Sequence, residues 1–252
     1  MTKRAFLVWR WAVVFFANVP NLLMVAWLFF WVTRTTPQPS SDALRWNLAL
    51  FAAFAAVHSA TATHAWKRVF CSVFPEAFER ATYVVISGVT LLALLALWRP
   101  MPALLWRIEG LAGHVLDVTF WGALGAAWWV SRHFDEAAFV GTRQLAAHWK
   151  GTPVVSAPFV VKGPFRFTRH PMYLAMLVLL WSASTMTTGR LLFAILASAY
   201  FLIGLRFEER RLARDVGAPY TLYRANVPVL WPRLTPWTQP PSQALAGGDS
   251  AS

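Results

Sequence analysis

The chain has 252 residues, of which 57% are hydrophobic and only 13% are charged. Soluble domains usually carry about 45–50% apolar and about 25% charged residues, so this composition excludes an ordinary soluble fold and a disordered chain alike. The net charge of +12 comes from basic residues spread between apolar runs, which argues against a nucleic-acid partner. A single cysteine excludes an internal disulfide and a cysteine-based metal site, and we predict no metal.

Six apolar segments follow one another along the chain. A membrane-spanning helix needs about 17–25 mainly apolar residues, and the first four segments reach that length. The last two reach it only if their helices extend into flanking polar residues. The segments are 11–32, 46–66, 82–98, 111–131, 172–184 and 191–205. We predict an all-α, polytopic transmembrane bundle of about six spans, or five if the last pair, broken at 185–190, forms a re-entrant hairpin.

Positive charges divide unequally between the two sides that six spans create. Most of the 23 Lys and Arg residues fall on the side that holds both termini. The exceptions are Arg34, Arg45, Arg99, Arg107 and Arg190. Because cytoplasmic loops carry an excess of Lys and Arg, we expect both termini in the cytoplasm.

Two stretches stand outside the apolar pattern. The connection 132–171 is longer than a simple link between helices requires, and long connections are often functional. The last stretch, 235–252, is rich in Pro, Ser, Gly and Ala, and we predict that it is a disordered tail.

Several ionisable side chains gather at the expected cytoplasmic boundary. The topology places His58 in the cytoplasmic half of the second span, His133 after the fourth and His170 before the fifth. Glu208 and Glu209 follow the sixth. Ionisable groups at a membrane are costly and usually serve a site. The alternative is that they only reach headgroups and water or, for His58, make a structural hydrogen bond.

The strongest local signal is the run Lys-Gly-Pro-Phe-Arg-Phe-Thr-Arg-His-Pro-Met-Tyr at 162–173. Its Gly-Pro pair predicts a turn, and Pro171 suits the first position of a helix. Cationic side chains stand beside this predicted helix start: Arg166, Arg169 and His170. A helix N-terminus with such neighbours favours an anion. Glu208 and Glu209, after the sixth segment, should lie at the same membrane boundary as these cations. Positive and negative groups would then meet at the open end of the helical hairpin, which suits a zwitterionic ligand.

This run, the hairpin, the Glu-Glu pair, Gly-x-x-Tyr-x-x-Tyr at 217–223 and Val-Pro at 227–228 together resemble one superfamily. It contains the isoprenylcysteine carboxyl methyltransferases and the phospholipid methyltransferases, and the match covers about 158–232. The resemblance implies a membrane methyltransferase that uses S-adenosylmethionine as its cofactor. The cofactor contacts that it implies are the strand-like stretch Ala157, Pro158, Phe159 and Val160, then Phe165, His170, Pro171, Met172, Tyr173 and Glu208.

Further motifs between 57 and 212 resemble the bacterial methanethiol S-methyltransferases in particular. They imply a small lipophilic thiol as the acceptor and a bacterial inner membrane as the location. Val57, Ala175 and Arg190 depart from that pattern, which leaves the exact thiol open. Gly204 stands where prenylcysteine enzymes carry Arg, which counts against a carboxylate acceptor.

These resemblances give a domain division and a set of roles. We expect a methyltransferase domain over 1–234, with its cofactor half at about 154–234. We expect His170 with Tyr173 to position the cofactor, and Arg169 or Arg166 to pair with its carboxylate. His58 or His133 could help to deprotonate the thiol, so all three histidines are catalytic candidates.

Three alternatives remain beside a thiol methyltransferase. The same machinery could methylate a prenylcysteine, a phospholipid amine or another lipophilic substrate. The N-terminal motifs are also reminiscent of membrane proteins linked to denitrification and to haem-dependent isomerisation, in which His58 would be an axial ligand. A non-catalytic membrane scaffold is the third. The sequence makes no prediction of the oligomeric state.

Overall fold

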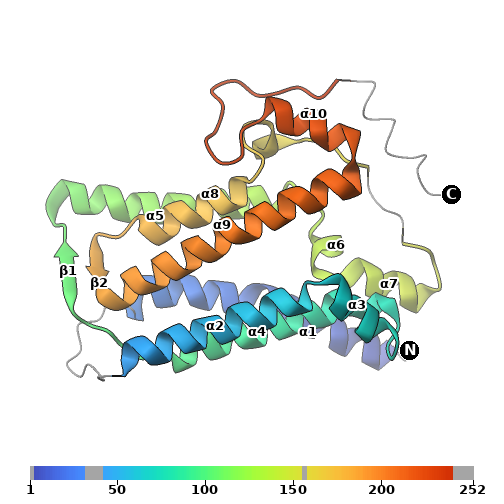
Figure 1. Ribbon diagram of the computed structural model, residues 1–252, viewed down its shortest axis with the longest axis horizontal. Helices are drawn as coiled ribbons and strands as arrows, with labels where there is room; N and C mark the ends of the chain where they lie inside the picture. Colours follow the sequence, from blue (N-terminus) through green and yellow to red (C-terminus); the bar gives the residue numbers. More distant parts are fainter. Residues whose placement is uncertain (1–2, 32–41, 155–157, 241–252) are drawn as a thin grey trace. The chain divides into compact units, whose positions relative to one another are not determined.

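A computed structural model describes residues 3–31, 42–154 and 158–240 of the chain, most of which are helical (Figure 1). The chain divides into two compact units, each assembled from three stretches of sequence. Unit 1 comprises Met1–Arg107, Asp135–Val154 and Thr185–Phe193, and unit 2 comprises Ile108–Phe134, Val155–Ser184 and Ala194–Ser252. Helices distant in sequence therefore share a core in each unit.

Unit 1 is built on long apolar helices, with α4 packed against both α1 and α2. The long elements are α1 (Lys3–Ala26), its π-helical continuation η1 (Trp27–Trp31), α2 (Ala43–Thr61) and α4 (Glu79–Leu97). The short ones are α3 (His64–Cys71), the 3-10 turn η2 (Glu76–Phe78), α6 (Glu136–Val140) and α7 (Thr142–Lys150).

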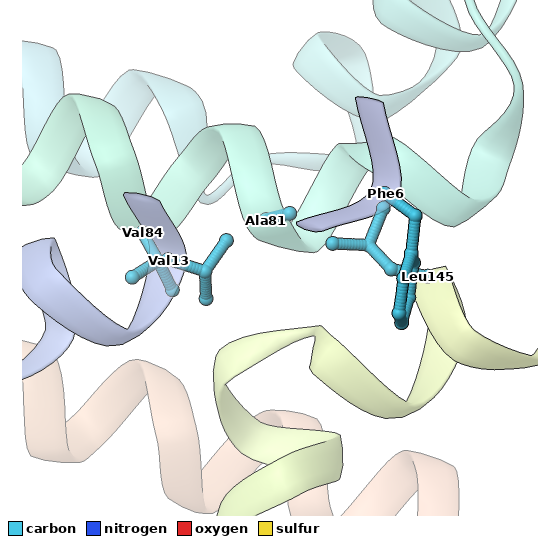
Figure 2. Close-up of a cluster of buried hydrophobic side chains, with 5 residues drawn as sticks. All are labelled: Phe6, Val13, Ala81, Val84 and Leu145. Carbon is cyan, nitrogen blue, oxygen red and sulfur yellow. The ribbon is translucent and has the colours of Figure 1, made fainter. Parts of the chain in front are cut away.

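One end of unit 1 closes over a cluster of buried side chains from α1, α4 and α7. Figure 2 shows its members: Phe6, Val13, Ala81, Val84 and Leu145. Burial of these apolar side chains away from water stabilises this end of the unit. The cluster ties α7, which follows the predicted fourth segment, to the first helix of the chain.

Gly88 lets α4 approach α1 closely. A Cβ atom at this position would lie 2.6 Å from the carbonyl oxygen of Phe16 and 2.7 Å from the Phe16 Cβ. Small residues at such crossings allow apolar helices to pack backbone against backbone. The contact therefore depends on the absence of a side chain.

We expect Gly88→Val to lower the free energy of unfolding by about 1–3 kcal/mol, because the added atoms force the two helices apart. Thermal unfolding of the detergent-purified protein measures the effect. Gly122→Val on α5 is the matched control, since a Cβ there meets no atom of the described residues within 4 Å. Equal losses for the two variants would contradict the close packing of α1 and α4.

A short strand pair joins two connections of unit 1. Strand β1 (Leu104–Arg107) runs antiparallel to β2 (Thr185–Thr187), with Trp106 opposite Met186 and a bulge between Leu104 and Trp106. The sequence predicted only a break at 185–190, so this pairing is new. It joins two connections that six spans would place on the same side of the membrane.

Unit 2 contains α5 packed along α8, together with most of α9. Its elements are α5 (Gly110–Ser131), the 3-10 turn η3 (Gly163–Arg166), α8 (Pro171–Trp181), α9 (Thr188–Val216) and α10 (Ala218–Asn226). The first turn of α9 belongs to unit 1. Trp181 of α8 donates from Nε1 to Ser198 Oγ of α9 at 3.0 Å, which fixes the hairpin on its apolar side.

The helices confirm an all-α membrane architecture. Among the described residues, three stretches are long and apolar enough to cross a membrane: Arg4–Phe30, Glu76–Leu97 and Thr188–Val216. The pair α2 and α3, bent by 64°, would supply a fourth as one broken span. The fourth and fifth predicted spans correspond to α5, with 22 residues, and to α8, with 11, and neither is among these candidates. Six spans therefore stay a prediction.

Two helix boundaries differ from those predicted. The second apolar segment does not continue to Trp66, because Thr63 caps a new helix by accepting from the Trp66 amide. The last segment does not end at 205, because α9 runs on to Val216. This extension carries Glu208 and Glu209 on the helix itself and fixes their orientation.

Candidate active site

The start of α8 is held in place by the chain beyond α10. The amides of Arg169 and His170 donate to the carbonyls of Pro228 and Val229 at 2.9 and 3.2 Å. Pro171 occupies the first helical position, as predicted, where its missing N–H costs nothing. The two residues that precede α8 are thus fixed by backbone contacts before their side chains are considered.

Both of these side chains reach one carboxylate, that of Glu209 on α9. Arg169 Nε and His170 Nε2 donate to Glu209 Oε1 at 2.9 and 2.6 Å. A third donor is the Tyr220 hydroxyl of α10, also at 2.6 Å. Arg169 Nη2 lies 2.9 Å from Glu209 Oε2. We call Arg169, His170, Glu209 and Tyr220 the Glu209 network.

The Glu209 network is buried, since His170 is 5% and Glu209 8% exposed. Buried charges are stable only when paired and hydrogen-bonded, and this carboxylate meets that condition. An ionised carboxylate only accepts, so His170 Nε2 carries the proton of this bond. His170 Nδ1 therefore points elsewhere, and it lies 4.0 Å from Glu208 Oε2.

Arg169 has further partners in the protein. Its Nη1 donates to the carbonyls of Arg224 and Val227 at 2.8 and 2.7 Å. Together with the Glu209 ion pair, these bonds occupy the guanidinium on all of its nitrogens. Arg169 therefore holds α8, α9 and α10 together, and its pairing with a cofactor carboxylate stays a prediction.

Two tyrosines of α10 line the other side of the network. Burial raises the pKa of Tyr220 above its ordinary value, and the nearby Glu209 carboxylate raises it further. Burial also raises the pKa of Tyr223, whose hydroxyl donates to the Phe165 carbonyl at 2.6 Å. Both hydroxyls thus stay protonated donors, one to the network and one to the turn that precedes α8.

Glu208 contrasts with its neighbour. Its side chain is 33% exposed, and Oε2 accepts from the Tyr173 hydroxyl at 2.8 Å. The Tyr173 ring packs edge-on against His170 and against Phe201. Glu208 is therefore the carboxylate of this pair that a ligand can reach, and Tyr173 and His170 hold its surroundings in place.

Gly204 lies one helical turn before Glu208. Among the described residues, a Cβ at this position would meet only the Tyr173 hydroxyl, at 4.0 Å. The backbone of α9 thus leaves room beside the Tyr173–Glu208 pair. A long side chain at 204 would project into this space.

The stretch before η3 packs on the same tyrosines. Phe159 contacts both Tyr220 and Tyr223 edge-on, within a buried cluster that also contains Val227. Pro158 to Val160 form no regular structure, so the prediction of a strand-like stretch is wrong for these residues. Ala157 lies outside the described residues. Phe165 packs against Phe134.

Residues beyond α10 return to this stretch, and part of the predicted tail, 235–240, makes contacts here. The Trp237 amide donates to the Arg166 carbonyl at 2.9 Å, and Arg166 Nε donates back to the Trp237 carbonyl. Gln239 Oε1 accepts from the Val161 amide at 3.0 Å. Trp237 packs on Tyr223, which explains why a polar, proline-rich sequence is held here. Residues 241–252 lie outside the described residues.

The other two histidine candidates have hydrogen-bond partners of their own. His133 Nδ1 lies 2.9 Å from the Trp129 carbonyl, and its ring covers Gly163, where a Cβ would come within 2.1 Å of it. Gly163 adopts a positive φ of 50° that favours glycine. His58 belongs to unit 1, with Nε2 2.9 Å from the Tyr83 hydroxyl.

The structure thus assembles a subset of the predicted site residues. It brings together Arg169, His170, Tyr173, Glu208 and the turn at Phe165. It also adds two residues that the sequence pointed to without a role at the site, Glu209 and Tyr220. Their signals were present, in the second carboxylate of the pair and in the Gly-x-x-Tyr motif. Within the described residues, no group of three or more His, Cys, Asp or Glu could hold a metal ion.

The apolar helices define an integral membrane protein, and comparison with known proteins defines its class. A methanethiol S-methyltransferase 2 of Bradyrhizobium diazoefficiens is 37% identical over 199 residues, which cover 79% of this chain and 77% of that protein. A methanethiol S-methyltransferase of Mycobacterium tuberculosis is 37% identical over 205 residues, covering 80% and 83%. Nurim of Sus scrofa is 29% identical over 197 residues, or 72% of each chain.

The chain belongs to the methanethiol S-methyltransferase family and is a methyltransferase. The resemblance read from its motifs is confirmed at this level. No family model matches the sequence, and no solved structure matches it.

Proposed function

We propose that the chain is an integral-membrane, S-adenosylmethionine-dependent enzyme that methylates a small lipophilic thiol, such as methanethiol, to a thioether. The names of the relatives support the thiol, since methanethiol is the substrate that those names give. The observation that carries the proposal is the pair of carboxylates on α9. Glu209 is hydrogen-bonded within the fold, whereas Glu208 is partly exposed beside Tyr173.

The exposed Glu208 suits a ligand that carries positive charge. When bound, S-adenosylmethionine supplies a methyl group from a sulfonium cation. In our proposal Glu208 accepts hydrogen bonds from a polar part of this cofactor, while His170 and Tyr173 fix its position. The remaining proposed contacts are Ala157, Pro158, Phe159, Val160, Phe165, Pro171 and Met172. The buried Phe159 cluster next to the network can supply the apolar wall that an adenine ring requires.

The protein then has two tasks, which are to align the reacting groups and to keep water away. Transfer of a methyl cation to a thiolate removes charge, so a dry site at the membrane favours it. A base that accepts the thiol proton speeds the step. His133 Nδ1 must donate to the Trp129 carbonyl, which leaves Nε2 as the acceptor. We propose either His133 or His58 as the base that accepts the thiol proton.

The acceptor is tested by comparing two substrates on the purified protein. We expect turnover of methanethiol to exceed that of acetyl-farnesylcysteine at least about tenfold per unit concentration, or about 1.4 kcal/mol in transition-state stabilisation. The reason is that Gly204 offers no cation for a substrate carboxylate beside Tyr173. If the prenylcysteine were the better acceptor, the thiol assignment would be wrong, and failure to bind S-adenosylmethionine would reject the cofactor itself.

We also propose that both termini and the active site face the cytoplasm of a bacterial inner membrane. The excess of Lys and Arg on that side supports this orientation. In a Cys71→Ser background, we expect Lys150→Cys to be labelled by a membrane-impermeant thiol reagent only after permeabilisation. Glu109→Cys, at the start of α5, should be labelled in intact spheroplasts. Labelling of both positions from one side would contradict the topology.

A further inference from the structure

A hollow of about 460 Å³ lies between the turn that precedes α8 and the returning chain beyond α10. Its lining residues are Val160, Val161, Lys162, Gly163, Arg166, Thr238, Gln239 and Pro240. Small-molecule sites usually occupy about 300–1,000 Å³, so this hollow is large enough for a ligand headgroup. It is built by contacts independent of Glu208 and Tyr173.

The lining of the hollow is positively charged, which determines the kind of ligand that it favours. Lys162 and Arg166 are cations, and no carboxylate lines the hollow among the described residues. The Lys162 side chain is exposed, and its ammonium makes no hydrogen bond or ion pair within the described part of the chain. This differs from Arg169, whose charge is neutralised by Glu209. A cationic ligand is therefore disfavoured here, and an anion is favoured.

Arg166 is held in a fixed position at the wall. Its Nε donates to the Trp237 carbonyl at 2.9 Å, and its Nη2 donates to Thr238 Oγ1 at 3.2 Å. No bond to Nη1 is formed by the described residues. A guanidinium that is oriented in this way loses little entropy when it binds an oxyanion, and a flexible Lys beside it adds charge.

The remaining walls and the place in the sequence point to a lipid. Val160, Val161 and Pro240 make part of the lining apolar, which suits a glycerol backbone better than a free ion. Arg166 also lies five residues before Pro171, where the apolar helix α8 begins. Basic pockets at the ends of membrane helices bind the headgroups of anionic lipids.

We propose that this hollow binds the phosphodiester headgroup of an anionic phospholipid, with Lys162 and Arg166 as its cationic contacts. The site lies beside the proposed Glu208 cofactor site: Val160 borders both, and Arg166 is also one of the two residues expected to pair with the cofactor carboxylate. Bound lipid would brace the turn at 163–166 against the chain at 237–240, and so support the start of α8.

The test titrates the detergent-purified full chain with short-chain phosphatidylglycerol and follows its thermal unfolding temperature. We expect saturable stabilisation that weakens with salt, and an apparent affinity about tenfold lower in Lys162→Glu. Lys162→Gln should give a smaller loss, since it removes the charge without reversing it. Lys150→Glu on α7 is the matched control for a change in net charge and should bind as the unchanged protein does.

Two further ligands separate the possible sources of the anion. Short-chain phosphatidylcholine, which is zwitterionic, should stabilise less, and inorganic phosphate should bind more weakly than phosphatidylglycerol. Phosphate binding as tight as that of the lipid would overturn the lipid assignment, as would equal lipid affinity in Lys162→Glu and Lys150→Glu. S-adenosylmethionine binding should be unchanged in Lys162→Glu. A parallel loss would instead place the hollow within the cofactor site.

Discussion

Replacing Glu209 with alanine should lower the free energy of unfolding by about 3–5 kcal/mol, because it leaves the buried Arg169 without its counter-charge. The same change removes the acceptor for His170 Nε2 and for the Tyr220 hydroxyl. Hydrogen-bond donors that are left without an acceptor in a buried site carry their full desolvation cost. Equilibrium unfolding of the detergent-purified protein, followed by tryptophan fluorescence, measures the loss.

Glu208→Ala is the matched control, since it removes the same side chain from the adjacent position. Its stability should stay close to that of the unchanged protein, because Glu208 is a third exposed and, among the described residues, accepts a hydrogen bond only from Tyr173. Glu209→Gln should fall between the two, because the amide oxygen still accepts from Tyr220. If Glu208→Ala and Glu209→Ala were equally destabilising, the separation of a structural carboxylate from an accessible one would be refuted.

Glu208→Gln should weaken S-adenosylmethionine binding about 10–150-fold, because a hydrogen bond to a charged group contributes about 1.5–3 kcal/mol. The folded protein should be retained, so the loss is expected in affinity and not in unfolding temperature. Isothermal titration of S-adenosylmethionine into the detergent-purified protein, well below its unfolding transition, measures it.

Glu209→Gln is the comparison for this second result, measured under conditions in which it is fully folded. Its affinity should fall less than that of Glu208→Gln, since Glu209 acts through the position of His170. Tyr173→Phe should also fall less, because it removes one donor and leaves the Glu208 charge in place. Small and equal losses for Glu208→Gln and Glu209→Gln would reject Glu208 as the cofactor carboxylate.

The helices of the protein were predictable because apolar length is a local property. Each of the six apolar runs overlaps a long stretch of helix, and α5 begins within one residue of its predicted start. The pairing of β1 with β2 was not predictable, because strands of four and three residues carry little pattern of their own. Their register is fixed by a partner about 80 residues away, which no local signal reports.

The residues of the site were predictable, but which of its two carboxylates is buried was not. Glu208 and Glu209 are adjacent, and successive helical residues point about 100° apart, so the two carboxylates face different surroundings. Which one is buried depends on the rotation of α9, which is set by packing against α8 and α10. The motif identified His170 and Tyr173, whereas the importance of Tyr220 and of Trp237 follows from tertiary contacts alone.

The contacts that fix the start of α8 also impose an order on biosynthesis. Arg169 and Glu209 are 40 residues apart, Arg169 and Val227 58, and Thr168 and Val229 61. Chains fold from the N-terminus as they are made. The start of α8 therefore lacks these contacts until the segment after α10 has been synthesised. A truncated product that stops before Val227 would keep every apolar helix and still lack the Arg169 contacts beyond α10. Possession of a closed site thus distinguishes a finished chain from one that has merely been inserted.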